Sequence, residues 1–281
     1  MTLKEACREG TERLKKTGVP EAGLDAWYLL EWACGVSRSH YLAYPEEELS
    51  AAQEQKYLEA VEKREKRIPL QHITGEQEFM GLSFLVNEHV LIPRQDTEIL
   101  VEEALKYLKP GMRFLDLCTG SGCILLSLLH FCPGAEGVGA DLSPEALRTA
   151  EKNRARLGTP AVLVESDLFE KIEGTFDLIV SNPPYISRKE ISGLMEEVRL
   201  HEPLMALDGH EDGLYFYREI AGRSPRYLKP GGMLCLEIGF DQGESVPALL
   251  RAEGFVEIEV VRDLAGLDRV VRARRGMETS E

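Results

Sequence analysis

The sequence lacks a long apolar run and a leader-like start. Its most apolar stretch, Cys123 to Cys132, is far shorter than the roughly 20 residues that cross a bilayer, and it contains Ser127 and His130. The first ten residues are charged and show no apolar segment followed by a cleavage site. We therefore expect no signal peptide, no membrane association and a cytoplasmic location.

Positive charge is also scarce. Lys and Arg number 33 against 48 Asp and Glu, for a net charge of −15. Binding to a phosphate backbone relies on clustered Lys and Arg. One basic cluster exists, but acidic residues interleave with it, which is typical of a solvated helix face: Lys63, Arg64, Lys66 and Arg67, with Glu62 and Glu65. No direct nucleic-acid binding is expected, whereas a protein or small-molecule partner fits the charge.

Metal-ligand spacing is absent as well. The six cysteines form no C-x-x-C pair, so reduced thiols are expected in a chain without an export signal. The six histidines show no ligand spacing with one another or with the cysteines. We predict no metal site.

The pattern of the chain changes twice. Residues 1–75 carry apolar residues at helical intervals and predict a small helical domain. Residues 76–94 approximate a period of two and predict a β-hairpin linker with its turn at Asn87-Glu88. Residues 95–281 begin with a helix over 97–108 and then alternate strands and helices. This alternation predicts an α/β domain with a doubly wound, mostly parallel sheet.

The predicted strands and helices of this third region follow one another at short intervals. The strands are 114–117, 137–140, 161–165, 176–181, 232–238, 256–261 and 269–271, with helices at 122–131 and from Ser143. Ser143-Pro144-Glu145 is a typical helix start, with a capping Ser, Pro in the first turn and an acid near the positive helix end.

A glycine loop follows the first of these strands. Phe114-Leu-Asp-Leu-Cys-Thr-Gly-Ser-Gly-Cys123 places a strand, a tight turn and a helix start in succession. Gly120 and Gly122 let the backbone approach a ligand closely. Asp116, at the strand end, can accept hydrogen bonds from an amino-acid ammonium group or from neighbouring amides. Ligands of open α/β sheets sit beyond the carboxyl ends of the strands.

An acid ends the next strand. Asp141 stands 19 residues after Gly122, a spacing that suits a carboxylate binding the ribose hydroxyls of a nucleoside. A dinucleotide enzyme would look similar, but Leu125 occupies the position of the third glycine of G-x-G-x-x-G. A tight turn without a ligand is the alternative for the loop taken alone.

The tetrapeptide Asn182-Pro183-Pro184-Tyr185 follows the strand 176–181. The prolines restrict the backbone. The Asn182 side-chain carbonyl and the Pro183 backbone carbonyl can together accept both hydrogens of an –NH2 group, and Tyr185 can lie against a planar substrate. An amide or aromatic amine is a poor nucleophile because its lone pair is delocalised. Two acceptors orient it and stabilise the positive charge that develops as it attacks.

Together these motifs resemble class I methyltransferases that modify amide or exocyclic amino nitrogens, and more specifically the HemK/PrmC family of release factor glutamine N5-methyltransferases. Three further segments carry the resemblance: Ile68 to Gly75, Val90 to Glu98, and His201 to Gly209 followed by Asp212-Gly-Leu214. The resemblance implies a class I, Rossmann-like domain with a seven-stranded, mostly parallel sheet. It also implies a helical N-terminal domain that recognises the substrate, joined by a hairpin.

The resemblance further implies S-adenosylmethionine as methyl donor, with S-adenosylhomocysteine as product and no metal, and a bacterial class I release factor as partner, methylated on the glutamine of its Gly-Gly-Gln motif. It implies cofactor contacts from Asp116, Cys118, Thr119, Gly120, Ser121, Gly122, Asp141, Leu142, Asp167, Leu168 and Asn182, with support from Arg94, Thr97 and Glu98. Asn182 and Pro183 would grip the glutamine amide, beside Pro184, Tyr185 and Leu91. Glycine is more frequent in the family at Cys118 and His210, and an aromatic residue at Leu168.

Three other functions stay open from sequence. DNA adenine N6-methylation uses Asp/Asn-Pro-Pro-Tyr on the same fold, but it requires base extrusion and backbone contacts for which no basic region is evident. Methylation of a ribosomal-protein glutamine is a closer alternative, and Arg94 to Glu98 favours the release factor. The third is a cofactor-binding scaffold without catalysis, against which the intact Asn182 motif argues. A monomer is expected.

Overall fold

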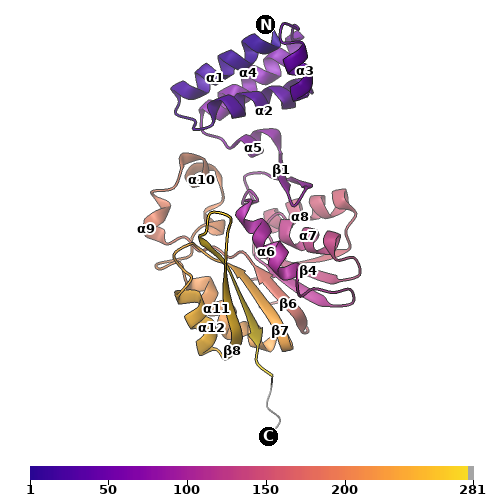
Figure 1. Cartoon of the computed structure of the whole chain (residues 1–281), viewed down its shortest axis with the longest axis vertical. Coiled ribbons are helices and arrows are strands. Elements are labelled where there is room, and N and C mark those ends of the chain that lie inside the picture. The colour runs from indigo at the N-terminus through magenta and orange to yellow at the C-terminus, as the bar shows by residue number, and fades with distance from the viewer. Residues whose placement is uncertain (278–281) are drawn as a thin grey trace. The chain divides into compact units, whose positions relative to one another are not determined.

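The computed structural model describes residues 1–277, and within them the chain forms two compact units (Figure 1). The first contains Met1–Glu76 together with Met195–His201, and the second contains Gln77–Leu194 and the chain from Glu202 onward. The N-terminal helical region is therefore present. The segment 195–201, which lies far along the chain, belongs to the first unit and was not predicted there.

The first unit is a bundle of helices around one apolar core. Its elements are α1 (Leu3–Lys16), α2 (Ala22–Cys34), α3 (Arg38–Ala43), α4 (Ala51–Glu65), α5 (Leu70–Thr74) and α10 (Glu196–His201). Capping boxes start α1 at Thr2 and α4 at Ser50, since each cap side chain accepts a backbone N–H three residues on. Leu14, Leu30 and Tyr57 are fully buried in the core.

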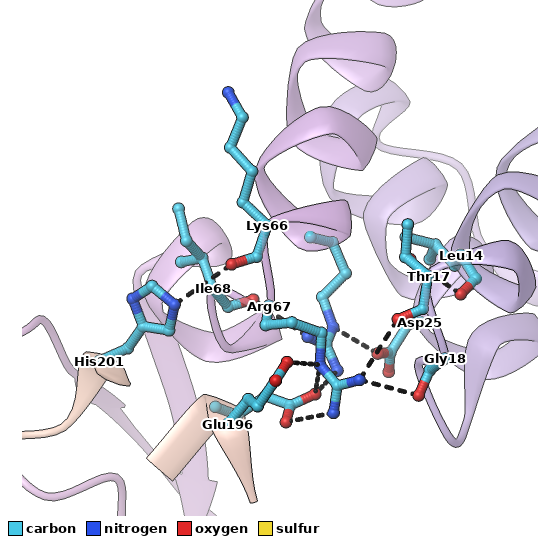
Figure 2. A network of polar contacts seen from close by, with 11 residues as sticks. Leu14, Thr17, Gly18, Asp25, Lys66, Arg67, Ile68, Glu196 and His201 are labelled. Carbon is cyan, nitrogen blue, oxygen red and sulfur yellow. Dashed lines mark hydrogen bonds and ion pairs between the residues drawn. The ribbon is translucent and has the colours of Figure 1, made fainter. Parts of the chain in front are cut away.

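A network of buried ion pairs holds α10 in this unit. Arg64 Nε lies 2.7 Å from Asp25 Oδ2, and Arg64 Nη2 lies 2.8 Å from Glu197 Oε1. Arg67 also donates two hydrogen bonds to Glu197, at 2.8 and 2.6 Å, and one to the Gly18 carbonyl at 2.9 Å (Figure 2). Figure 2 shows His201, from the same segment, beside the Lys66 carbonyl.

The prediction of a solvated basic face is therefore wrong for two of its four residues. Lys63 and Lys66 are exposed, but Arg64 is buried and Arg67 is half-buried in the network. The carboxylates that pair with them come from α2 and from a segment about 130 residues away in the chain. Such long-range partners leave no local pattern in the sequence.

The network makes the stability of this unit sensitive to Glu197. We expect Glu197→Gln to lower its free energy of unfolding by about 2 kcal/mol, since the two guanidinium groups lose the negative charge and one of the two oxygens that accept from them. Both tryptophans of the chain, Trp27 and Trp32, lie on α2, so urea unfolding followed by tryptophan fluorescence reports on this unit. Glu196→Gln is the matched control, because Glu196 is exposed and 3.9 Å from Arg67. Equal urea midpoints for both variants would contradict the prediction.

The same contact predicts an acid-sensitive stability. Burial acts to raise the pKa of Glu197, but hydrogen bonds from Arg67 and Arg64 outweigh it and lower the pKa from 4.5 to about 2. A carboxyl with a depressed pKa in the folded state stabilises the fold above its unfolded pKa. That contribution is therefore present above about pH 4.5 and is lost as the pH falls toward 2. Glu197→Gln should flatten the fluorescence-detected stability across this interval.

The hairpin is shorter than predicted. Strands β1 (Glu76–Phe79) and β2 (Leu82–Leu85) are joined by Met80-Gly81, both with positive φ, as in a two-residue hairpin turn. The hairpin turn predicted at Asn87-Glu88 is wrong. The chain does turn there, with the Val90 N–H donating to the Asn87 carbonyl at 3.2 Å and the His89 N–H donating to Asn87 Oδ1 at 2.9 Å, but this turn joins no paired strands. Residues 86–95 form no strand. The apolar period there reflects packing of Val86 and Val90 on Ala146, not pairing.

The second unit contains the predicted sheet. Its strands are β3 (Arg113–Leu117), β4 (Glu136–Asp141), β5 (Ala161–Glu165), β6 (Phe176–Ser181), β7 (Leu228–Glu237), β8 (Phe255–Arg262) and β9 (Asp268–Arg275). The order is β5-β4-β3-β6-β7-β9-β8, parallel through β7 and antiparallel in the last two pairings. The mostly parallel, seven-stranded α/β fold is thus confirmed.

Helices cover both faces of this sheet. One face packs on α6 (Asp96–Leu105), α7 (Cys123–Phe131), α8 (Pro144–Leu157) and the hairpin, and the other on α11 (Tyr215–Arg223) and α12 (Ser245–Ala252) (Figure 1). Two shorter helices, α9 (Arg188–Ile191) and α10, follow β6. Successive residues of β7 alternate between the two cores: Cys235 packs with α6 and α7, and Leu234 and Leu236 with α11 and α12.

Candidate functional site

The carboxyl ends of the three central strands meet at one edge of the sheet. Leu117, the last residue of β3, pairs with Ala140 of β4 on one side and Ser181 of β6 on the other. The Ser181 hydroxyl donates to the Leu117 carbonyl at 2.8 Å and fastens β6 to β3. The loop from Cys118, the acid Asp141 and the amide Asn182 therefore leave the sheet side by side, where open α/β sheets bind ligands.

A cavity of about 250 Å³ opens at this edge, entirely within the second unit. Of the predicted site residues, it is lined by Leu91, Thr97, Cys118, Thr119, Gly120, Ser121, Asp141, Leu142, Asp167, Leu168, Asn182 and Pro184. The structure does not bring the following to its lining: Arg94, Glu98, Asp116, Gly122, Pro183 and Tyr185. The structure thus brings most of the glycine loop, the carboxylates of Asp141 and Asp167, and Asn182 with Pro184 to the wall of a single cavity.

The loop Cys118 to Gly122 has a left-handed backbone at three positions. The φ angles are +59° at Cys118, +55° at Gly120 and +78° at Gly122. Glycine adopts this region without strain, so Cys118 is the position of the three that holds a left-handed backbone with a side chain. A Cβ on Gly122 would lie 3.3 Å from the Ala150 Cβ, so this glycine serves the packing of α8 and not the cavity wall.

Asp116 anchors the glycine loop from within the protein core. Its carboxylate is fully buried and accepts the Thr119 hydroxyl at 2.6 Å and the Leu125 N–H at 3.2 Å through Oδ2. Burial raises its pKa to about 7, against the effect of these two hydrogen bonds. The expected contact to neighbouring amides is present, whereas contact with a cofactor ammonium stays a prediction.

Asp141 lies in the cavity wall and binds two loop amides. Oδ2 accepts the Gly120 N–H at 2.8 Å and Oδ1 accepts the Ser143 N–H at 2.9 Å. Burial raises the pKa of this carboxyl above its ordinary value, against the effect of these bonds. Each carboxylate oxygen has a further lone pair that can accept from a ribose hydroxyl.

The motif Asn182-Pro183-Pro184-Tyr185 begins at the cavity wall. Asn182 lines the cavity, and its Nδ2 lies 3.4 Å from Thr97 Oγ1 at the start of α6. Thr97 was predicted as a supporting residue, and the structure links it to Asn182. The backbone that follows is tightly packed: a Cβ on Gly213 would lie 2.4 Å from the Tyr185 carbonyl oxygen.

The Tyr185 ring contacts the protein core. It packs against the cluster beneath α11 and α12, and its hydroxyl lies 3.5 Å from Glu237 Oε1. Burial and the neighbouring Glu237 carboxylate raise the pKa of this phenol. Stacking of Tyr185 on a substrate therefore stays a prediction, with Leu91 the member of that pair that lines the cavity.

Arg94 and Glu98 contact loops. Arg94 pairs with Glu202, whose other oxygen accepts the Ile92 N–H at 3.2 Å. Glu98 accepts the Met80 N–H at 2.6 Å and so ties the hairpin to α6. The sequence offered no role for Glu202, and the structure shows that it fastens the loop carrying Leu91 to the segment after α10.

Two segments line the cavity beyond the predicted residues. They contribute His89, Val90 and Pro93 from the loop before α6, and Pro203, Met205, Ala206, Asp208, His210 and Phe216 from the segment before and into α11. Both segments carried motifs in the sequence, but no residue type there signalled a wall of a cavity. His210 has φ of +70°, which explains why glycine is more frequent at this position.

Within residues 1–277, no group of three or more His, Cys, Asp or Glu side chains is arranged to hold a metal ion. No helix in this part of the chain is long and apolar enough to cross a membrane.

Family models of known proteins match both the N-terminal helical region and part of the α/β region. A family model described as PrmC N-terminal domain matches residues 5–75, and one described as Methyltransferase small domain matches residues 95–202. A release factor glutamine methyltransferase of Caulobacter vibrioides is 45% identical over 276 residues, 96% of either chain. One from Moorella thermoacetica is 44% identical over 284 residues, 99% of this chain and 100% of the relative.

The fold has solved counterparts. A methyltransferase from Pyrococcus furiosus superposes with a TM-score of 0.56 at 17% identity, covering 76% of this chain and 99% of the other. At that identity the likeness concerns the fold alone, and it agrees with the sheet described above.

Proposed function

The chain belongs to the family of release factor glutamine methyltransferases, and we propose that it transfers a methyl group from S-adenosylmethionine to the N5 amide nitrogen of the glutamine in the Gly-Gly-Gln motif of release factors. The observation that carries the proposal is the cavity shared by Asp141 and Asn182, which stand at the carboxyl ends of β4 and β6, on either side of β3. One ligand can contact the glycine loop there while a second reaches Asn182.

The chemistry of the cavity fits this donor. The loop Cys118 to Gly122 would hold its methionine part, Asp141 its ribose, and Asp167 with Leu168 its adenine. When bound, S-adenosylmethionine supplies a methyl group activated by its sulfonium charge. A largely apolar cavity wall that includes the carboxylates of Asp141 and Asp167 suits a nucleoside ligand.

The protein's part in the reaction is positioning. Asn182 Oδ1 and the Pro183 carbonyl would accept the two N–H groups of the glutamine amide and stabilise the positive charge that develops on its nitrogen. The nitrogen's extra proton leaves after methyl transfer, so no group of tuned pKa has to act before it. Pro183 is buried. Its backbone carbonyl would be one of the two acceptors, and the two prolines restrict the backbone that positions it.

The remaining assignments are part of the same proposal. The helical unit recognises the release factor, the enzyme acts as a monomer in the cytoplasm, and it binds neither nucleic acid nor membrane directly. The net charge of −15 supports the absence of nucleic-acid binding.

The test is transfer of labelled methyl from S-adenosylmethionine to three substrates: a purified release factor, its Gly-Gly-Gln→Gly-Gly-Ala variant and duplex DNA. We expect label on the wild-type factor alone. Label on DNA would show that DNA is a substrate in place of the proposed one. Label on the Gly-Gly-Ala variant would show that the methylated residue is not the glutamine of this motif. Absence of label on all three would overturn the proposal, and ribosomal proteins would be assayed next.

A further inference from the structure

His210 carries an imidazole on a strained backbone. Its φ angle is +70°, in the left-handed region that residues other than glycine rarely adopt. Two hydrogen bonds fix this conformation: the His210 N–H donates to Asp208 Oδ1 at 2.8 Å, and the Arg188 N–H donates to the His210 carbonyl at 3.0 Å. Strained positions persist where the surrounding structure fixes them, and they cluster at binding and active sites. His210 lines the same cavity as Asn182.

The His210 ring is held in one orientation. Arg188 Nη2 lies 3.2 Å from His210 Nδ1. The ring packs against Tyr215 and Phe216, at centroid distances of 4.2 and 5.8 Å. Arg188 is itself held in place, because its Nε–H donates to Asp208 Oδ2 at 3.0 Å. Rotation of the ring would therefore break both the contact with Arg188 and the packing on the two aromatic side chains.

The contact with Arg188 also selects the tautomer of His210. A guanidinium group only donates hydrogen bonds, so Nδ1 is the acceptor and carries no hydrogen. The hydrogen of the neutral ring is then on Nε2, which makes this nitrogen a donor. No group of residues 1–277 accepts a hydrogen bond from Nε2. Arg188 does not line the cavity, so Nε2 is the ring nitrogen that a ligand in the cavity can reach.

His210 belongs to the same side of the cavity as the amide motif. The segment before it runs beside the chain that follows Tyr185, since the Gly209 N–H donates to the Ile186 carbonyl at 2.8 Å. That chain continues from β6, whereas the acids assigned to the cofactor follow β4 and β5, on the other side of β3. The donor of His210 is therefore associated with the part of the cavity assigned to the release factor.

We propose that the Nε2–H of His210 donates a hydrogen bond to a backbone carbonyl of the release-factor segment that enters the cavity, at the glycines of its Gly-Gly-Gln motif. The inference rests on the proposed function. A glycine has no side chain, so a binding site recognises it through its backbone N–H and carbonyl groups. A carbonyl that leaves water on entering the cavity needs a donor, and the fixed Nε2–H supplies one without reorganisation.

The pair His210→Phe and His210→Gln tests the donor separately from the ring. Phenylalanine keeps a ring against Tyr215 and has no donor, whereas glutamine can accept from Arg188 through Oε1 and donate through Nε2. We expect His210→Phe to raise KM for the release factor by about 10-fold and to change kcat by less than about 3-fold, as loss of a hydrogen bond made equally in ground and transition states does.

The Kd of S-adenosylmethionine is the control for this pair. It should change by less than about 3-fold in His210→Phe, because the contact is made to the other ligand. His210→Gln should recover most of the loss in KM. An unchanged KM in His210→Phe, equal losses in both variants, or a loss confined to cofactor affinity would overturn the inference.

A readout without turnover separates this inference from the proposed reaction. In enzyme with ¹⁵N-labelled histidine, the His210 ring signals are those that vanish in His210→Phe, and their shifts should show the hydrogen on Nε2. With S-adenosylhomocysteine bound, addition of the Gly-Gly-Gln→Gly-Gly-Ala release factor should shift the Nε2 signal, since the contact is to the backbone and not to the glutamine side chain.

Three results of this experiment would overturn the inference: a hydrogen on Nδ1, an Nε2 signal that the factor leaves unchanged, or a shift caused by the wild-type factor and not by its Gly-Gly-Ala variant. Each decides the inference even if the enzyme methylates no release factor. Failure of the proposed function is shown instead by the labelled-methyl assay alone.

Discussion

Replacing Asn182 with alanine is expected to lower kcat for methyl transfer to the release factor by about 10²- to 10³-fold, comparable to removing one oxyanion-hole donor. The substitution removes the side-chain acceptor for the substrate amide and leaves the Pro183 carbonyl alone to orient the nitrogen. It also leaves Thr97 without its partner. Steady-state kinetics with saturating S-adenosylmethionine measure the effect, and calorimetry measures cofactor affinity, which should change much less.

Asn182→Asp is the matched control for this experiment. An aspartate keeps an oxygen acceptor of the same reach, so it can still accept an N–H of the substrate amide. We expect it to retain clearly more activity than Asn182→Ala. Near-normal turnover in Asn182→Ala would remove Asn182 from the reaction.

Replacing Asp141 with alanine is expected to weaken the binding of S-adenosylmethionine. It should raise the Kd of S-adenosylmethionine by about 10²-fold, because two charge-assisted hydrogen bonds to the ribose are lost. The loop also loses the anchor that Asp141 provides to the N–H groups of Gly120 and Ser143, at 2.8 and 2.9 Å. At saturating cofactor, kcat should fall far less than in Asn182→Ala. Isothermal titration calorimetry with S-adenosylmethionine and with S-adenosylhomocysteine measures the change.

Asp177→Ala is the control for Asp141. Asp177 lies near the amino end of β6, away from the cavity, where it pairs with Lys229 at 2.8 Å and accepts the Arg113 N–H. Its removal should leave the Kd of the cofactor unchanged. If Asp141→Ala also left that Kd unchanged, the ribose assignment would be refuted.

The strands were predictable because their signals are local. A run such as Phe176 to Ser181 is apolar at four of its six positions, as expected for a strand covered on both faces, and it was predicted at its observed bounds. The same holds for Ala161–Glu165. Helix ends were predictable where a capping side chain stands next to its helix, as at Ser143.

The hairpin shows the limit of local patterns. Alternating apolar residues from Phe84 to Ile92 look like paired strands, yet only the part up to Leu85 pairs. Beyond it, Val86 and Val90 are buried against α8 while the backbone turns at Asn87. Burial on alternate residues is common to both arrangements, and only the neighbouring helix decides between them.

Sequence alone indicates where the candidate site residues stand: the glycine loop, Asp141 and Asn182 each lie at a predicted strand end, so their meeting at one edge followed from the fold class. The groups that support them are visible only in the folded chain. Glu237 beside the Tyr185 hydroxyl, Glu202 beside Arg94 and Glu197 between two arginines lie far along the chain from the groups they contact. A carboxylate's partner in three dimensions depends on packing between distant segments, and such partners leave no spacing in the sequence.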